Sequence, residues 1–173
     1  GNMIDIIVSD ILMPEMDGLE LCNQIKSNIS FSHLPLILLS AKTDTGTKIN
    51  GLKKGADVYM EKPFSIEQLK AQINSVLENR HNIHKKFIES PLEYYKLNNE
   101  TDSENALFIK KLNELILENM SSEEFSIDNI ASDFAISRTS LHNKIKSITG
   151  VTPNNYIKLI RLNKSAELLA TGK

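Results

Sequence analysis

Three short apolar runs, each closed by a polar residue of a different kind, most constrain the fold of this chain. In chain order, the runs cover residues 4–8, 36–39 and 58–60. Asp10 follows the first run, Ser40 ends the second and Lys62 follows the third. Continuous apolar runs are typical of buried strands in a parallel sheet. Because open α/β sheets place their chemistry at the carboxyl ends of parallel strands, we expect an acid, a hydroxyl and an amine to meet there.

Composition narrows the class of protein. With 40% apolar and 24% charged residues, the 173-residue chain is typical of a soluble globular protein. No apolar stretch approaches the ~18 residues that span a bilayer. The single Cys22 excludes an intramolecular disulfide framework and suits a reducing compartment. We therefore expect a cytoplasmic protein with no direct membrane contact.

Residues 1–80 alternate between strand and helix patterns. Apolar residues recur at helical spacing from Leu19 to Ile25, after Asp17 as a helix start. A second helix is expected over residues 43–54, with Gly55 as its left-handed C-cap, and a third from Ser65 to about residue 80. The third has the apolar stripe Ile66, Leu69, Ile73, Val76 and Leu77. The order βαβαβα predicts a parallel sheet of three strands, the last over residues 57–60, covered by helices.

The remaining residues predict an all-α region. Residues 81–104 are interpreted as a linker that is helical in part, and residues 105–173 as a helical domain. Its first helix is expected near residues 105–120, and short helices from Ser126 and Ser137 flank a tight turn at Ala135. Gly150 ends the third helix and Pro153 starts a long fourth one. From residue 126 onward, seven basic residues stand against three acidic ones, which is a mild nucleic-acid signal.

The N-terminal motif resembles the second half of a two-component receiver domain. The resemblance rests on Asp10, Ser40 and Lys62 at matching intervals, and on four further residues: Pro14, Gly18, Tyr59 and Pro63. It implies a partial flavodoxin-like fold in which Asp10 is the phosphoacceptor and Lys62 pairs with a phosphoryl oxygen. Ser40 would donate to the phosphoryl group, Tyr59 would switch in response, and the bond from Lys62 to its proline would be cis.

The resemblance also implies Mg²⁺, with the Asp10 carboxylate and the Leu12 backbone carbonyl as ligands. The family's acidic pair, which closes its first strand, has no counterpart upstream of Asp10 in this sequence. Mg²⁺ binds weakly through a single carboxylate. We therefore assign Mg²⁺ to the intact parent, expect none bound here, and expect no measurable phosphorylation of this chain by a small phosphodonor. The strand at residues 4–8 would be an apolar sheet edge, which predicts a homo-oligomer.

The C-terminal segment resembles the AraC-type DNA-binding domain. The resemblance rests on residues 126–127, 130–131, 136–138, 141, 144–146, 149–150 and 152–153 and on a tail from Tyr156 to residue 169. It implies that Thr139, His142 and Asn143, on one helix face, read bases in the major groove. Arg138 and Lys146 would contact phosphates, which position the protein without specifying sequence.

Two further points follow from that segment. The alternative for Lys144, Lys146, Lys158 and Lys164 is that they are solvated helix faces, while Leu141 and Ile145 are expected in the core. The family carries two helix-turn-helix units, and this chain ends in or just after the helix that joins them. One unit makes few phosphate contacts, so we expect weak and salt-dependent DNA binding.

The leading interpretation is an α/β plus all-α fragment of a phosphorylation-regulated transcription regulator. The parent resembles either a free response regulator or the end of a hybrid sensor kinase anchored in the inner membrane, with a histidine kinase domain as phosphodonor. A pseudo-receiver that only dimerises is an alternative. A phosphoaspartyl hydrolase is disfavoured, because Leu12 occupies the place of its second acid. The fragment itself is not expected to be an enzyme.

Overall fold

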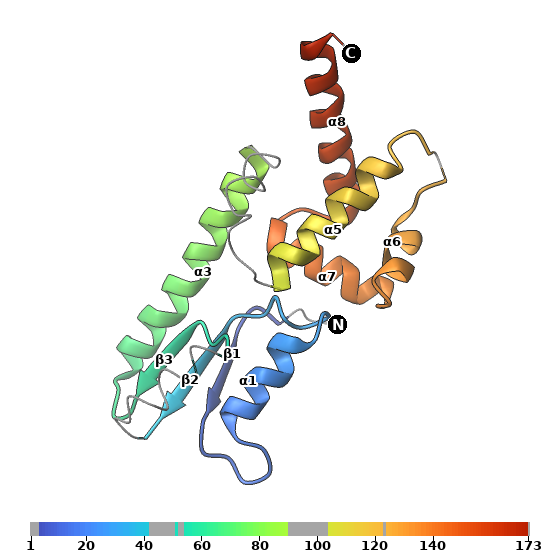
Figure 1. Cartoon of the computed structure of the whole chain (residues 1–173). Coiled ribbons are helices and arrows are strands. Elements are labelled where there is room, and N and C mark those ends of the chain that lie inside the picture. Colours follow the sequence, from blue (N-terminus) through green and yellow to red (C-terminus); the bar gives the residue numbers. More distant parts are fainter. Residues whose placement is uncertain (1–3, 42–50, 52–53, 90–103, 123, 173) are drawn as a thin grey trace. The chain divides into compact units, whose positions relative to one another are not determined.

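The computed structural model describes residues 4–41, 51, 54–89, 104–122 and 124–172 (Figure 1). The chain forms two compact units, Gly1–Arg80 and His81–Lys173. The first contains the sheet, and the second is helical wherever it has regular structure in the described residues. The expected helix over residues 43–54 lies largely outside the described residues.

The first unit is built on a parallel sheet. Its strands are β1 (Ile7–Asp10), β2 (Leu36–Ser40) and β3 (Val58–Glu61), in the order β1-β2-β3. Both pairs are parallel, with Asp10 opposite Leu39 and Ser40 opposite Glu61. The predicted three-stranded parallel sheet is confirmed, and the three strands end together at one edge.

Helix α1 (Gly18–Ser27) covers one face of this sheet. Asp17 caps it, because its carboxylate accepts a hydrogen bond from the Glu20 amide at 2.7 Å. The helix contributes Cys22 to a buried cluster and packs Leu19 and Ile25 against it. The other buried members of this cluster are Ile11, Leu36, Leu38 and Ala56. Burial of each large apolar side chain contributes about 1.5–3 kcal/mol, so this cluster stabilises the packing of α1 on the sheet.

The first strand differs from the prediction. β1 begins at Ile7 rather than Ile4, and Ile4 is 60% exposed. Val8 is 39% exposed, so the strand is not buried on both faces as its apolar run suggested. β1 has a neighbour on one side only among the described strands, and edge strands bury less surface than central ones. In contrast, the central β2 buries Leu36, Ile37 and Leu38 completely.

The third strand is also displaced, by one residue. Asp57 was expected inside it but precedes it, and its carboxylate accepts hydrogen bonds from the Leu36 amide at 2.9 Å and from Lys26 Nζ at 2.8 Å. The Asp57 amide also donates to the Leu36 carbonyl at 3.0 Å, so side chain and backbone of Asp57 together join the loop before β3 to the start of β2. Gly55, just before it, has φ +92° and is left-handed as predicted.

Helix α3 (Ile66–Glu89) is longer than the sequence indicated. It begins after Ser65, whose hydroxyl accepts from the Gln68 amide at 3.1 Å, as predicted. It continues past residue 80 into the segment interpreted as a linker. Its expected apolar stripe is not buried in the described structure, and Ile66 is 67% exposed. Arg80 instead ties the helix to the sheet, because its guanidinium donates to the His33 carbonyl at 2.8 Å.

Four helices of the second unit follow the expected order. They are α5 (Glu104–Glu118), α6 (Ile127–Asp133), α7 (Arg138–Thr149) and α8 (Pro153–Thr171). Ser137 caps α7 by accepting from the Ser140 amide at 3.0 Å, and Gly150 ends it with φ +78°. Both ends of this helix are as predicted from the sequence.

The core of the second unit joins all four helices. Its fully buried side chains include Leu112 and Ile116 from α5, Ile130 from α6 and Leu141 from α7. Tyr156 of α8 is fully buried and donates its hydroxyl to Asn113 Oδ1 of α5 at 2.6 Å. Leu141 and Ile145 are in the core as expected. None of the helices in the described part of the chain is both long and apolar enough to span a bilayer.

Gly18 holds the start of α1 against the end of β1, and this contact is testable. A Cβ at Gly18 would lie 2.3 Å from the Asp10 carbonyl oxygen and 2.9 Å from the Ile11 Cα, both backbone atoms. We predict that Gly18→Ala lowers the free energy of unfolding by about 1–3 kcal/mol, as overpacking does, in urea titrations followed by circular dichroism.

Gly51→Ala is the matched control for this prediction. Its added Cβ would meet no backbone atom among its nearest neighbours, which are the flexible ends of the Leu19 and Leu38 side chains at 3.3 Å and the Tyr59 ring at 3.6 Å. We expect a smaller loss than for Gly18→Ala. Equal losses for the two variants would contradict the backbone contact described for Gly18.

Candidate functional site

The carboxyl edge of the sheet brings together an acid and an amine. Asp10 ends β1, and Lys62 follows β3 directly. Lys62 Nζ donates to Asp10 Oδ2 and forms an ion pair with it across the intervening strand β2. The two side chains are 35% and 38% exposed, so solvent reaches both. The expected meeting of Asp10 and Lys62 at this edge is therefore observed, and the peptide bond from Lys62 to Pro63 is cis.

The ion pair keeps the acid ionised. The hydrogen bond from Lys62 is the main cause that lowers the pKa of Asp10 below its ordinary value, and the charge of Lys62 and the backbone at Leu12 and Ile11 act in the same direction. Desolvation opposes them. A carboxylate nucleophile must be deprotonated to react, so this electrostatic arrangement suits attack by Asp10.

Ser40 and Tyr59 lie on the strands between and beside these two groups. Ser40 ends β2 and is buried, and its carbonyl accepts a hydrogen bond from the Lys62 amide at 2.7 Å. Tyr59 lies on β3 and packs against the cluster under α1. Its hydroxyl is buried and has no hydrogen-bond partner among the described residues. The tyrosine is thus inside the sheet–helix interface in this structure.

The residues present do not fit a complete magnesium site. Asp10 offers one carboxylate, and Lys62 already bonds one of its oxygens. Within the part of the chain that the structure describes, no three His, Cys, Asp or Glu side chains come together as metal ligands would. Mg²⁺ requires near-octahedral oxygen ligation, which one carboxylate and the Leu12 carbonyl do not supply.

A second candidate site is the helix-turn-helix of α6 and α7. Ala135 makes the turn with φ +52°, a left-handed conformation that is uncommon for residues other than glycine. The chain reverses tightly there, because the Ile136 amide donates to the Ala131 carbonyl at 3.1 Å. On α6, the Asn129 side chain accepts from the Ser126 amide at 2.9 Å and fixes the start of the helix.

The residues predicted to contact DNA lie along α7, from its first residue, Arg138, to Lys146 in its last turn. Thr139 is exposed, and His142 and Asn143 are half-buried. Lys146 is exposed. Arg138 is 65% exposed and forms a salt bridge with Asp128 of α6 at 3.0 Å. The structure therefore leaves at least part of each of these side chains accessible to a ligand.

Lys144 does not lie on a solvated helix face, which was the alternative interpretation for it. It is completely buried, and its ammonium lies 4.9 Å from the centre of the Phe108 ring of α5 and 3.4 Å from Asn105 Oδ1. Desolvation lowers the pKa of Lys144 to about 8, although Glu104 acts in the opposite direction. Sequence reasoning missed this burial. The spacing indicated it, since Lys144 lies at i+3 from Leu141 on the inner face of the helix, but a lysine was given more weight as a surface residue.

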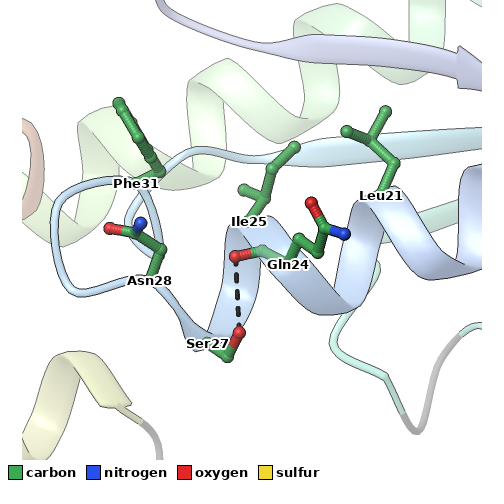
Figure 2. Close-up of a pocket in the computed structure, with 6 residues that line it drawn as sticks. All are labelled: Leu21, Gln24, Ile25, Ser27, Asn28 and Phe31. Atoms are coloured by element: carbon green, nitrogen blue, oxygen red, sulfur yellow. Dashed lines mark hydrogen bonds between the residues drawn. The ribbon is translucent and has the colours of Figure 1, made fainter.

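A groove lined by α1 and the loop that follows it was also missed. Its volume is about 440 Å³, and Figure 2 shows its lining residues. They are Leu21, Gln24, Ile25, Ser27, Asn28 and Phe31. The groove lies at the C-terminal end of α1, whereas the N-terminal end of α1 contacts β1 beside Asp10. It is therefore separate from the Asp10 site. Its apolar and amide residues form no recognisable sequence motif, so the sequence did not indicate it.

Comparisons with known proteins match one family in each of the two units. Residues 1–74 match the response regulator receiver domain family. Residues 116–158 match the AraC family of bacterial regulatory helix-turn-helix proteins. The chain therefore combines a response regulator receiver region with an AraC-type helix-turn-helix region, as the sequence predicted.

Relatives at the level of whole sequences fall into two kinds. Histidine kinase P4 of Formosa agariphila is 39% identical over 99% of this chain, which spans only 12% of that protein. Response regulator ArlR of Staphylococcus saprophyticus is 43% identical over 46% of this chain and 35% of its own length. Among solved structures, the receiver domain of Francisella response regulator 1452 is 43% identical, with a TM-score of 0.40, over 45% of this chain and 63% of its own. The chain thus spans only a minor part of histidine kinase P4 and of response regulator ArlR.

The effect of Lys62 on Asp10 can be measured directly. We predict that Lys62→Met raises the pKa of Asp10 towards its ordinary value, because the variant removes both the hydrogen bond and the positive charge. Carbon-detected NMR titration of the Asp10 carboxyl group measures this shift.

Lys26→Met is the matched control, since Lys26 pairs with Asp57, which precedes β3. It removes the same charge from the same unit and should leave the titration of Asp10 unchanged. An Asp10 pKa that is equally low in the Lys62→Met variant would contradict the ion pair as its cause.

Proposed function

We propose that this chain is part of a phosphorylation-regulated, sequence-specific DNA-binding transcription regulator of a two-component system. The observation that carries the proposal is the presence, in one chain, of a receiver-type Asp10–Lys62 pair and an AraC-type helix-turn-helix. The first is suited to receive a phosphoryl group, and the second is suited to bind DNA.

In this proposal, Asp10 is the phosphoacceptor. Its carboxylate attacks the phosphoryl group of a phosphohistidine, the bond from phosphorus to histidine nitrogen breaks, and an aspartyl phosphate forms. In the structure Lys62 donates a hydrogen bond to Asp10. After phosphorylation it would donate instead to a phosphoryl oxygen and stabilise the added charge. Ser40, at the adjacent strand end, would donate to another oxygen. Tyr59 would report the change, and its unbonded buried hydroxyl is consistent with a residue that can move.

Receiver domains generally use Mg²⁺ for phosphorylation. We propose that Asp10 and the Leu12 backbone carbonyl are ligands of that ion in an intact parent protein, and that this chain alone does not hold it. The edge strand β1, with Val8 partly exposed, supports self-association.

On the DNA side, α7 is the proposed recognition helix. Asn143 is suited to bond adenine through two hydrogen bonds, Thr139 to contact a thymine methyl group, and His142 to donate or accept. Arg138 and Lys146 would contact phosphates. All five lie on α7, whose capped N-terminal end suits docking in the major groove.

We further propose three regions: a receiver region over residues 1–80, a connection over 81–104 and a DNA-binding region over 105–173. The likeness to a protein named histidine kinase supports a hybrid kinase as the parent and a histidine kinase domain as phosphodonor. Such a parent would be anchored in the inner membrane with this segment in the cytoplasm, where its DNA lies. The segment itself would be a regulator rather than an enzyme.

DNA binding is the first test of this proposal. A pool of duplexes is first selected from a randomised library by the 173-residue chain. Fluorescence anisotropy at low salt then compares the affinity of the chain for this selected pool with its affinity for unselected duplex. We predict that Asn143→Ala weakens binding to the selected duplex by about 1–3 kcal/mol, the value of one bidentate base contact. Binding to unselected duplex should change little.

Lys146→Ala provides the comparison for that variant. A phosphate contact carries no sequence information, so this substitution should weaken binding to selected and unselected duplexes alike and reduce the salt dependence. If both Asn143→Ala and Thr139→Ala keep the native sequence preference, α7 is not the element that reads the bases.

Phosphorylation is the second test. We predict that phosphoramidate and Mg²⁺ give no measurable +80 Da adduct on the 173-residue chain, because one carboxylate and one carbonyl hold Mg²⁺ weakly. Intact mass spectrometry of the native and Asp10→Asn proteins measures this. A stoichiometric adduct that is absent from Asp10→Asn would overturn the argument from magnesium and favour a functional acceptor over a pseudo-receiver.

A further inference from the structure

The Phe108 side chain of α5 contacts both helices of the helix-turn-helix. Its ring lies 4.6 Å from the Phe134 ring at the end of α6, at an interplanar angle of 42°. The Lys144 ammonium of α7 lies 4.9 Å from its centre. Figure 1 shows these three helices together in the second unit. One aromatic side chain of α5 is therefore a shared support for α6 and α7.

The lysine in this cluster is chemically unexpected. A leucine or methionine at the same place would fill the space without the cost of removing an ammonium group from water. The structure instead provides specific partners for the charge: the face of the Phe108 ring and, at 3.4 Å, the amide oxygen of Asn105. Both partners are on α5. The lysine thus makes a directional link where an apolar residue would make only a packing contact.

The position of this link on α7 matters for recognition. Lys144 follows His142 and Asn143 directly in sequence, and Leu141 and Ile145 beside it are buried. Successive helix positions are separated by about 100°, so the direction of one side chain fixes the directions of the others. Anchoring Lys144 to α5 therefore sets the rotation of α7 about its own axis.

We propose that Lys144 is a positioning residue for DNA recognition: its ammonium, held on Phe108 and Asn105, sets the rotation of α7 that directs Thr139, His142 and Asn143 towards the bases. This inference rests on the proposed DNA-binding function. It gives a role in that function to a buried residue that does not itself contact DNA. Apolar packing tolerates small rotations of a helix, whereas a directional contact with a buried charge penalises them.

The test compares sequence discrimination with stability in the 173-residue chain. Discrimination is the ratio of affinities for duplex selected by the native chain and for unselected random duplex. We expect Lys144→Met to lower this ratio about tenfold, within the range for one disturbed base contact. We expect its Tm at pH 7 to be unchanged or higher, because an apolar residue of similar volume removes the cost of the buried charge.

Two further variants separate positioning from other effects. Lys158→Met removes the same charge from an exposed position on α8, so it controls for the general electrostatic attraction of DNA and should retain the ratio. Lys144→Arg keeps the cation and should recover most of the ratio. An undiminished ratio for Lys144→Met, or a ratio that falls together with Tm and is not recovered by arginine, would overturn the proposal.

Amide hydrogen exchange provides a readout that needs no DNA. We expect Lys144→Met to speed exchange in residues 139–146 severalfold while the middle of α8 keeps its native rates, because local anchoring is lost without global unfolding. Unchanged exchange in α7 would overturn the proposal even if the native chain selects no duplex. Failure of the native chain to select a sequence would count against the proposed function instead, so the two failures are distinguishable.

Discussion

The parallel register of the sheet is the constraint on which the Asp10–Lys62 site depends. Asp10 and Lys62 are 52 positions apart in the chain, and they meet because Asp10 lies opposite Leu39 while the next residue of β2, Ser40, lies opposite Glu61. A slip of one residue in either pairing would move a side chain to the other face of the sheet. Leu36, Ile37 and Leu38 of β2 are completely buried, and a slip would disturb their packing, so this burial favours the observed register.

Much of this arrangement could be predicted from the sequence. The strand endings at Asp10 and Ser40, and the turn glycines Gly55 and Gly150, follow from local chemistry that is independent of distant contacts. The start of β1 could not be predicted, because Ile4 and Ile7 are alike in type and differ only in the contacts their surroundings provide. The continuation of α3 past residue 80 could not be predicted either, because the residues there are of mixed polarity and show no helical pattern.

The DNA-binding region shows the same division. The cap at Ser137 and the helix start at Pro153 are recognisable from residue type alone, and Ser137 accepts the expected backbone hydrogen bond. Lys144 was misjudged because charge is usually a surface signal, and a buried lysine requires an aromatic partner from a helix more than thirty residues away. Assigning side chains to the candidate sites therefore depended on knowing which helices pack together, which no local pattern contains.

The salt bridge between Arg138 and Asp128 has a consequence for how this region would meet a nucleic acid. Both side chains are 65% exposed, so the pair is worth at most about 1 kcal/mol and opens readily. If Arg138 contacts a DNA phosphate as proposed, the Asp128 carboxylate competes with that phosphate for the guanidinium. Each such contact then costs the free energy of the ion pair, whichever sequence is bound. The pair would therefore lower the affinity for all DNA without changing the preference between sequences.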